Sequence, residues 1–167
     1  MKKISMIVPC YNEEENVGLF YQDVLNTYQG SKKYKIELIF IDDGSSDGTL
    51  KELKKIVKIS KFPIKMISFS RNFGKESVIY AGLKKATGDY TVIIDADMQQ
   101  PPSLTLKMAE ILDEDLDCDC VCYYQNDRIE SKFMTKLKTS FYKFMNRVSD
   151  VEIKQGASDF RMFRVNV

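Results

Sequence analysis

The sequence feature that most constrains the fold is an apolar run that ends in two carboxylates. Val92, Ile93 and Ile94 form a continuous β-branched segment, which is typical of a strand buried on both faces. Asp95 and Asp97 follow it directly. Ligands of open α/β sheets bind beyond the carboxyl ends of the parallel strands. This stretch therefore predicts a parallel sheet that carries two acids at its ligand-binding edge.

Two interpretations of this acidic pair are open from the stretch alone. Asp95 and Asp97 would suit one hard cation between them, or one cation and one substrate hydroxyl. Alternatively, one aspartate caps a helix and the other is solvated in a turn. Pro101 and Pro102 suit the first turn of a following helix, where a missing N–H costs little. The acids would then lie in the connection between a strand and a helix.

The rest of the chain alternates between strand-like and helix-like segments. Strands are predicted over 4–9, 36–41, 64–69, 90–94 and 119–124, with a last one around 158–163. Helices follow the first four strands, with these inward-facing residues: Val17, Tyr21, Val24 and Tyr28; Leu50, Leu53 and Ile56 or Val57; Ile79, Leu83 and Ala86; Leu104, Met108 and Ile111. Gly88 suits the end of the third helix. The alternation predicts an α/β class with a mainly parallel sheet, in a single domain of 167 residues.

A long helix is predicted after the fifth strand, over 133–148. It carries a stripe of basic residues, namely Lys132, Lys136, Lys143 and Arg147. An ordinary amphipathic helix would explain this stripe, and so would a helix face that lies near anionic lipid.

The chain contains no histidine, which removes the usual general base and the commonest ligand of transition metals. Acid–base chemistry must therefore fall to carboxylates, lysine, tyrosine or cysteine. Any metal would be held by oxygen, which favours Mg²⁺ or Mn²⁺. The net charge of +1 gives no indication of a nucleic-acid partner.

The four cysteines do not have the spacing of a zinc site or a redox pair. They are Cys10, Cys118, Cys120 and Cys122. We interpret them as small buried hydrophobic residues of a protein in a reducing compartment.

Polar residues also stand at the ends of the second and third predicted strands. Asp42 and Asp43 follow the second strand, and Arg71 and Lys75 flank a glycine turn after the third. The two cations would face phosphate groups, or they are simply solvated. Because parallel strands end at one edge of a sheet, these residues are predicted to lie near Asp95.

Six motifs occur in order at these strand ends: Val8-Pro-Cys-Tyr-Asn-Glu-Glu14, Ile41-Asp-Asp-Gly-Ser-Ser-Asp-Gly-Thr49, Arg71-Asn-Phe-Gly-Lys75, Gly88-Asp89, Asp95-Ala-Asp-Met-Gln99 and Asp159-Phe-Arg161. With them the sequence resembles family 2 glycosyltransferases of the GT-A fold. Within that family it is similar to the bacterial branch of dolichol-phosphate mannose synthase-like enzymes, which glycosylate polyprenyl phosphate. The resemblance implies a GT-A Rossmann-like α/β/α sandwich with a mainly parallel central sheet, and a single catalytic domain over residues 1–167.

The resemblance also implies roles at matching positions. The residues expected to bind the nucleotide sugar are Pro9, Tyr11, Glu13, Asp42, Asp43, Arg71, Lys75 and Asp95. The expected metal ligands are Asp97, Asp95 and Gln99. The expected catalytic residues are Asp159, Arg128 and Asp97, and those expected at the acceptor are Arg128 and Arg161.

The implied activity is a metal-dependent, inverting transfer of a sugar from a nucleoside diphosphate sugar to polyprenyl phosphate, with Mg²⁺ or Mn²⁺ as cofactor. One alternative is a relative with a saccharide hydroxyl as acceptor, which would need a strong general base. Another is a nucleotide- or metal-binding module without turnover. Gln100 and Ser103 depart from the family pattern, because relatives usually carry acids there.

The resemblance implies a location at the cytoplasmic face of the bacterial inner membrane. Relatives continue into interface helices and transmembrane helices, so we expect this chain to be truncated before them and to be soluble by itself. No apolar run reaches the length of about 18 residues that a membrane span requires.

Overall fold

The computed structural model describes residues 1–124 and 157–165. Its elements are β1 (Lys2–Cys10), α1 (Val17–Tyr28), β2 (Tyr34–Asp42), α2 (Thr49–Ile59), β3 (Ile64–Ser68), α3 (Lys75–Leu83), β4 (Tyr90–Ile93), α4 (Leu104–Glu114), β5 (Cys120–Tyr124) and β6 (Ala157–Arg164). The helix predicted over 133–148, with its basic stripe, lies outside the described residues. The chain divides into two compact units, Met1–Val121 with Phe160–Val167, and Cys122–Asp159. The cavity described below belongs to the first unit.

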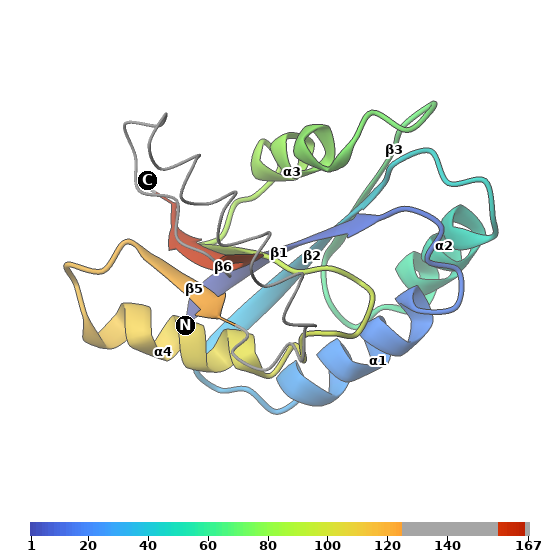
Figure 1. Cartoon of the computed structure of the whole chain (residues 1–167). Helices are drawn as coiled ribbons and strands as arrows, with labels where there is room; N and C mark the ends of the chain where they lie inside the picture. Colours follow the sequence, from blue (N-terminus) through green and yellow to red (C-terminus); the bar gives the residue numbers. More distant parts are fainter. Residues whose placement is uncertain (125–156, 166–167) are drawn as a thin grey trace, which may run out of the picture. The chain divides into compact units, whose positions relative to one another are not determined.

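The sheet has the strand order β3-β2-β1-β4-β6-β5 (Figure 1). β1 pairs in parallel with β2 and with β4, and β2 pairs in parallel with β3. β6 is antiparallel to β4, with Ile93 opposite Arg161. The prediction of an α/β class with a mainly parallel sheet is therefore confirmed.

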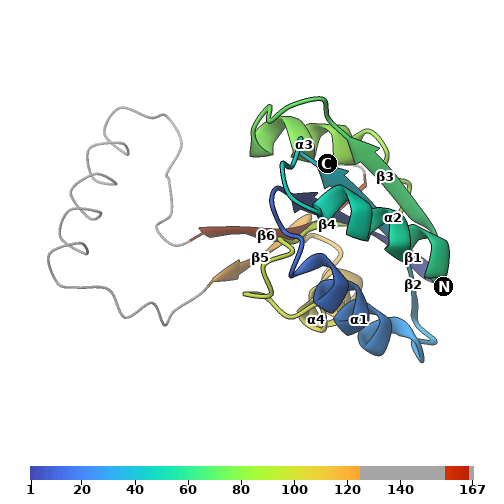
Figure 2. The same ribbon diagram turned by 90° about the vertical axis from the view of Figure 1, so that its right-hand side faces the viewer.

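Helices cover both faces of this sheet. Figures 1 and 2 show α3 on one face and α1, α2 and α4 on the other. Val78 of α3 packs on a buried cluster that includes Ile7 and Ile41. On the opposite face the ring of Phe20 in α1 meets Phe40 of β2 edge-on, with 6.3 Å between the ring centroids. Because strand side chains alternate in direction, each of the central strands serves both layers.

The structure corrects the predicted face of α3. Leu83 was expected to point inward, but it is 37% exposed, and Val78 and Gly82 are buried instead. The reason is the small size of Gly82, because a Cβ at that position would lie 2.5 Å from Cγ2 of Ile7. The bare backbone of the glycine therefore faces the sheet. The predicted inward positions of Ile79 and Ala86 are confirmed, because both are partly buried and pack on the same cluster as Val78.

The start and the face of α4 also differ from the prediction. The proline pair precedes the helix, and the N–H of Leu104 donates to the carbonyl of Pro101 (3.1 Å). Ile111 is 46% exposed, while Thr105 is fully buried. The hydroxyl of Thr105 lies 2.6 Å from the carbonyl of Pro102 and also contacts the hydroxyl of Tyr28. A threonine with its hydroxyl satisfied in this way can occupy a core position. In α1 and α2 the predicted faces are correct, with Ile56 buried in α2 and Val57 exposed.

Gly88 does not end α3, which stops at Leu83. It is required by close packing instead, because a Cβ at Gly88 would lie 2.7 Å from the carbonyl oxygen of Lys3. The N–H of Gly88 donates to the hydroxyl of Ser5 (2.8 Å), and this hydroxyl donates in turn to buried Glu37 (2.6 Å). A buried polar cluster thus ties β1, β2 and the segment before β4 together.

The four cysteines lie within the described residues and form no disulfide, and Cys122 is only partly buried. Burial is confirmed for Cys10, whereas Cys118 is only partly buried and Cys120 is exposed. The expectation of burial is wrong for Cys120 because β5, which begins there, is the outermost strand of the sheet. Within the two described stretches of the chain, no helix is both long enough and apolar enough to cross a membrane.

Candidate functional site

A cavity of about 330 Å³ opens where β1, β2 and β4 end. The chain runs from β1 outward to β2 and β3 and then returns to β4 on the other side of β1. Such a reversal of strand order leaves a crevice at the carboxyl ends, where open α/β sheets bind ligands. The cavity is lined by Pro9, Cys10, Tyr11, Glu13, Asp43, Asn72, Gly74, Lys75, Val78, Asp95 and Asp97.

The loop after β1 is fastened to the loop after β2 by side-chain hydrogen bonds. Asn12, which has a positive φ of 55°, accepts a hydrogen bond from the N–H of Ser46 (2.9 Å). Glu14 accepts one from the N–H of Gly48 (2.9 Å). Asn12 and Glu14 therefore have a structural role. Tyr11, which directly precedes Asn12, is 48% exposed and lines the cavity.

Two aspartates of the loop after β2 bind the loop's own polar groups. Asp42 is buried, and it accepts hydrogen bonds from the N–H of Ser45 (3.1 Å) and the hydroxyl of Ser68 (3.0 Å). It is not among the residues that line the cavity. Asp47 accepts a hydrogen bond from the N–H of Thr49 (3.0 Å), the first residue of α2. The predicted contact of Asp42 with a nucleotide stays a prediction.

Asp43 lines the cavity and also fixes the loop that follows β3. Its two carboxylate oxygens accept hydrogen bonds from the N–H groups of Phe73 (2.8 Å) and Gly74 (3.0 Å). Gly44 has a φ of +67°, and a Cβ there would lie 2.4 Å from the carbonyl carbon of Arg71. These contacts hold the loop tightly against β2, so they also fix where α3 begins.

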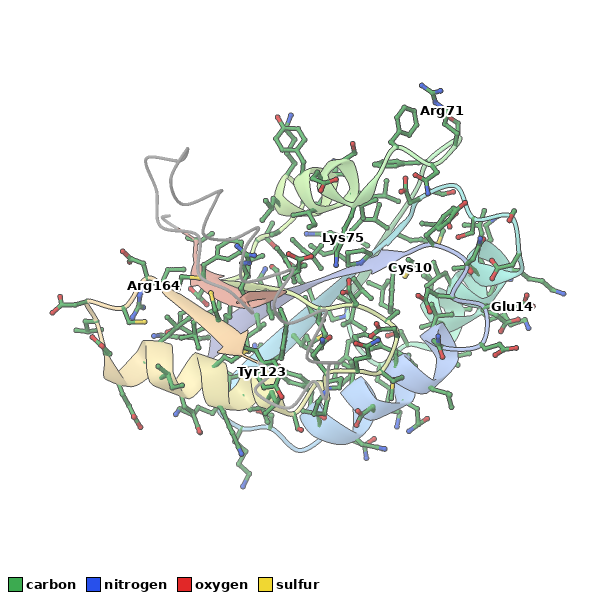
Figure 3. All side chains as sticks on the ribbon, viewed as in Figure 1. Cys10, Glu14, Arg71, Lys75, Tyr123 and Arg164 are labelled. Carbon is green, nitrogen blue, oxygen red and sulfur yellow. The ribbon has the colours of Figure 1, made fainter. Side chains whose placement is uncertain are left out.

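The two cations of that loop have different surroundings. Nζ of Lys75 lies 2.8 Å from Oδ2 of Asp95, and both residues line the cavity. The guanidinium of Arg71 lies 4.7 Å from the ring centroid of exposed Phe73. Figure 3 shows Arg71 at the outer end of the loop, far from Lys75 and Cys10. The structure thus brings Lys75 into the cavity and leaves the predicted phosphate contact of Arg71 a prediction.

Asp95 and Asp97 both line the cavity, as the sequence predicts for a cation site. Oδ1 of Asp97 accepts a hydrogen bond from the N–H of Gln99 (3.1 Å), whereas the side chain of Gln99 is exposed and not part of the lining. No cluster of three or more acids or cysteines suited to a metal occurs in residues 1–124 and 157–165. Two carboxylates fit a hard cation whose remaining ligands are phosphate oxygens and water. The donor set is thus suited to Mg²⁺ or Mn²⁺ that binds together with a diphosphate.

Cys10 is an unreactive part of the cavity wall. Burial, followed by the nearby negative charge of Glu13, raises the pKa of the Cys10 thiol well above its usual range. A thiol that stays protonated is neither a nucleophile nor a metal ligand at neutral pH.

The residues predicted for catalysis and for the acceptor lie near the end of the chain. Arg128 lies outside the described residues. Asp159 is an exposed residue of β6, and Arg161 is a half-buried residue of the same strand. Their predicted roles stay predictions.

Sequence reasoning missed four residues of the lining, namely Cys10, Asn72, Gly74 and Val78. Asn72 and Gly74 lie between Arg71 and Lys75 in one of the six motifs. Their place in that motif could have identified them as site residues. Val78 lies one turn of helix after Lys75 and is buried in α3, where the periodicity favoured Ile79.

Residues 5–167 match the family model described as Glycosyl transferase family 2. The chain belongs to this family. It is 36% identical over 166 residues to the "Prophage bactoprenol glucosyl transferase homolog" of Escherichia coli K12, a match that covers 99% of this chain and 53% of the relative. It is 35% identical over 161 residues to the "Bactoprenol glucosyl transferase" of Shigella phage SfX, covering 96% of this chain and 52% of that one. The chain therefore spans about half the length of these relatives.

The fold of this family 2 chain is shared with solved glycosyltransferases. The mannosyltransferase PcManGT from Pyrobaculum calidifontis, solved in complex with GDP-Man and Mn²⁺, superposes with a TM-score of 0.66 at 20% identity. The match covers 98% of this chain and 44% of that protein. The predicted GT-A fold is confirmed by this likeness.

Proposed function

We propose that this chain is the donor-binding catalytic part of an enzyme that transfers a sugar from a nucleoside diphosphate sugar to a polyprenyl phosphate. The observation that carries the proposal is a cavity at the switch point of a family 2 sheet, which is lined by Asp97 and by the ion pair of Lys75 with Asp95. The names of the bactoprenol glucosyl transferases support a polyprenyl acceptor. The GDP-Man complex of a protein with the same fold supports a nucleotide-sugar donor.

On the donor side, the exposed ring of Tyr11 offers a flat surface for a nucleobase, and Pro9 and Glu13 continue the same wall. Asp43 holds the loop that presents Lys75, and it lies within the same cavity. The ammonium of Lys75 would donate to an oxygen of the diphosphate in a charge-assisted hydrogen bond.

Asp95 and Asp97 would hold a divalent cation, either Mg²⁺ or Mn²⁺. When bound, such a cation stabilises the negative charge that develops on the leaving diphosphate. The two aspartates orient the donor by fixing where its diphosphate lies.

On the acceptor side, the chemistry requires little from the protein. A phosphate monoester has a second pKa of about 6, so it is mostly dianionic at neutral pH and needs no general base. Its direct attack on the anomeric carbon would invert the configuration there. Asp159 would then orient Arg128 or Arg161 toward the acceptor phosphate, without accepting a proton. Because polyprenyl phosphate is a membrane lipid, the reaction would take place at the cytoplasmic face of the bacterial inner membrane.

The donor site is tested by calorimetric titration of UDP and of GDP into the 167-residue chain, with Mn²⁺ and with EDTA. We expect binding of one of them that depends on Mn²⁺, and we expect Asp97→Ala to abolish this dependence. Asp117→Ala is the matched control, because Asp117 is an exposed aspartate outside the cavity. Equal affinity of the wild type and of Asp97→Ala for the nucleotide in Mn²⁺ would contradict the assignment.

A further inference from the structure

The ion pair between Lys75 and Asp95 places a cation on one of the two carboxylates proposed to hold the metal. Nζ of Lys75 lies 2.8 Å from Oδ2 of Asp95, and the side chains are 36% and 33% exposed. At this distance the ammonium both neutralises Asp95 and hydrogen-bonds one of its two oxygens. The oxygen Oδ2 is therefore already engaged in the protein without a ligand.

The backbone of Lys75 has little freedom to move away from this position. Lys75 is the first residue of α3, and the two residues before it donate their N–H groups to Asp43. The loop is also packed against Gly44, which leaves no room even for a Cβ. Only the four-carbon stem of Lys75 can swing, so its ammonium can reach different acceptors inside the cavity while its backbone stays fixed.

A divalent cation that binds Asp95 and Asp97 therefore competes with the ammonium for the negative charge of Asp95. Two positive centres a few ångströms apart repel each other, and the repulsion is stronger in a recessed site than in bulk water. Glu13 and Asp43 also line the cavity, but they already accept hydrogen bonds from Asn16 and from the loop before α3. Compensation of a divalent cation beside the lysine therefore falls mainly to Asp95 and Asp97. A bound diphosphate would change this balance, because it brings several negative charges and many acceptor oxygens.

We propose that Lys75 blocks metal binding at Asp95 until a nucleoside diphosphate enters, and that its ammonium then moves from Asp95 to a phosphate oxygen. Lys75 is thus a positioning residue that makes the binding of cation and nucleotide mutually dependent. This inference rests on the proposed function. It adds that the cation and the donor bind together and not independently.

The first test is the affinity for Mn²⁺ alone, measured by the electron paramagnetic resonance signal of free Mn²⁺. We expect Lys75→Met to bind Mn²⁺ about tenfold or more tightly than the wild type, because one repelling charge and one competitor are removed. The matched control is Lys55→Met, which breaks a lysine–carboxylate pair with Glu52 on α2, outside the cavity. This control should leave the Mn²⁺ affinity unchanged.

If the ion pair of Lys75 with Asp95 causes the gain in Mn²⁺ affinity, the gain must depend on Asp95. In an Asp95→Asn background, Lys75→Met should therefore produce no gain in Mn²⁺ affinity. Equal affinity of the wild type and Lys75→Met, including no binding by either, would overturn the proposal. So would a gain of the same size in the Asp95→Asn background, which would indicate a long-range effect of charge. Lys75→Gln, which keeps a polar side chain, replaces Lys75→Met if circular dichroism shows that the methionine variant does not fold.

The second test measures the affinity for the nucleotide, for which we expect Lys75→Met to cause a loss and not a gain. In saturating Mn²⁺, Lys75→Met should bind UDP or GDP about tenfold more weakly, because the phosphate loses its ammonium partner. Lys75→Arg should recover part of that loss. By linkage, the factor by which the nucleotide raises Mn²⁺ affinity should be smaller in Lys75→Met than in the wild type. An unchanged factor would also refute the inference. Failure of the wild type to bind either nucleotide would instead refute the proposed function, since the comparison with Mn²⁺ alone needs no nucleotide.

Discussion

Glu37 is the buried charge whose removal should affect the stability of this fold most clearly. Its side chain is 5% exposed, and it accepts hydrogen bonds from the hydroxyl of Ser5 (2.6 Å) and from the N–H (2.8 Å) and hydroxyl (2.8 Å) of Thr87. Nζ of Lys65 lies 3.0 Å from its second oxygen. Glu37→Gln keeps the size of the side chain and removes the charge. It also replaces one accepting oxygen by a donating amide.

The expected loss follows from the pKa of Glu37. Burial alone would raise this pKa, but hydrogen bonds from Ser5, Thr87 and Lys65 outweigh burial and lower it from 4.5 to about 2. A difference of that size corresponds to about 3 kcal/mol of unfolding free energy. Because the pKa is lower in the folded state, the stabilisation is fully present above pH 4.5 and is lost as the pH falls toward 2. In a chain of this length we therefore expect Glu37→Gln to lower Tm by roughly 6–12 °C at pH 7.

Urea unfolding of both proteins between pH 2 and pH 7, followed by circular dichroism, measures this difference. The matched control is Glu52→Gln, which removes the half-buried partner of exposed Lys55 and should change stability by less than about 1 kcal/mol. The reasoning is refuted if Glu37→Gln equals the wild type at pH 7. It is also refuted if the difference between them persists undiminished at the acid end of the range.

Two further predictions concern the helix glycines and the acceptor. Gly82→Ala should destabilise the protein by about 1–3 kcal/mol, because its Cβ would overlap Ile7. Gly18→Ala, whose Cβ meets no atom within 4 Å in α1, should stabilise it by about 0.5–1 kcal/mol, and opposite signs in thermal unfolding check the pair. With polyprenyl phosphate as acceptor, Asp159→Asn should keep part of the activity, and its residual rate should follow acceptor ionisation near a pKa of about 6. Near-total loss at every pH would favour a hydroxyl acceptor and a required base.

The strands and the parallel sheet were predictable from the sequence, whereas the helix faces that pack on the sheet were predictable only in part. Continuous β-branched runs such as 92–94 are typical of strands buried on both faces, and with the strand–helix alternation they indicated the parallel sheet. Leu83 of α3 and Ile111 of α4 were wrongly predicted to face inward, because buried Gly82 and Thr105 do not count as apolar residues in a periodicity. Both are buried for reasons that involve distant partners, namely Ile7 and Tyr28.

The candidate site was predictable as a place and only partly as a set of contacts. Strand ends located Asp43, Lys75, Asp95 and Asp97 at one edge, and all four line the cavity. Asp42 is adjacent to Asp43 in sequence, but it binds its own loop, since neighbouring residues at a strand end point in different directions. The pairing of Lys75 with Asp95 depends on the path of the loop before α3, which no local pattern in the sequence specifies.

The position of β6 has a consequence for how the protein is made. β6 comes last among the strands, yet it lies between β4 and β5 in the sheet. While the ribosome is still extending the chain beyond β5, the strands β3, β2, β1 and β4 can already pair, but β4 presents an open edge and β5 has no neighbour. An open edge of this kind can recruit a strand of another nascent chain. The edge closes only when Arg164 emerges and its N–H donates to the carbonyl of Asp119 (3.1 Å). We therefore expect completion of the sheet to be the late step of folding during synthesis, since it needs the last strand and pairs residues as far apart in the chain as Tyr90 and Arg164.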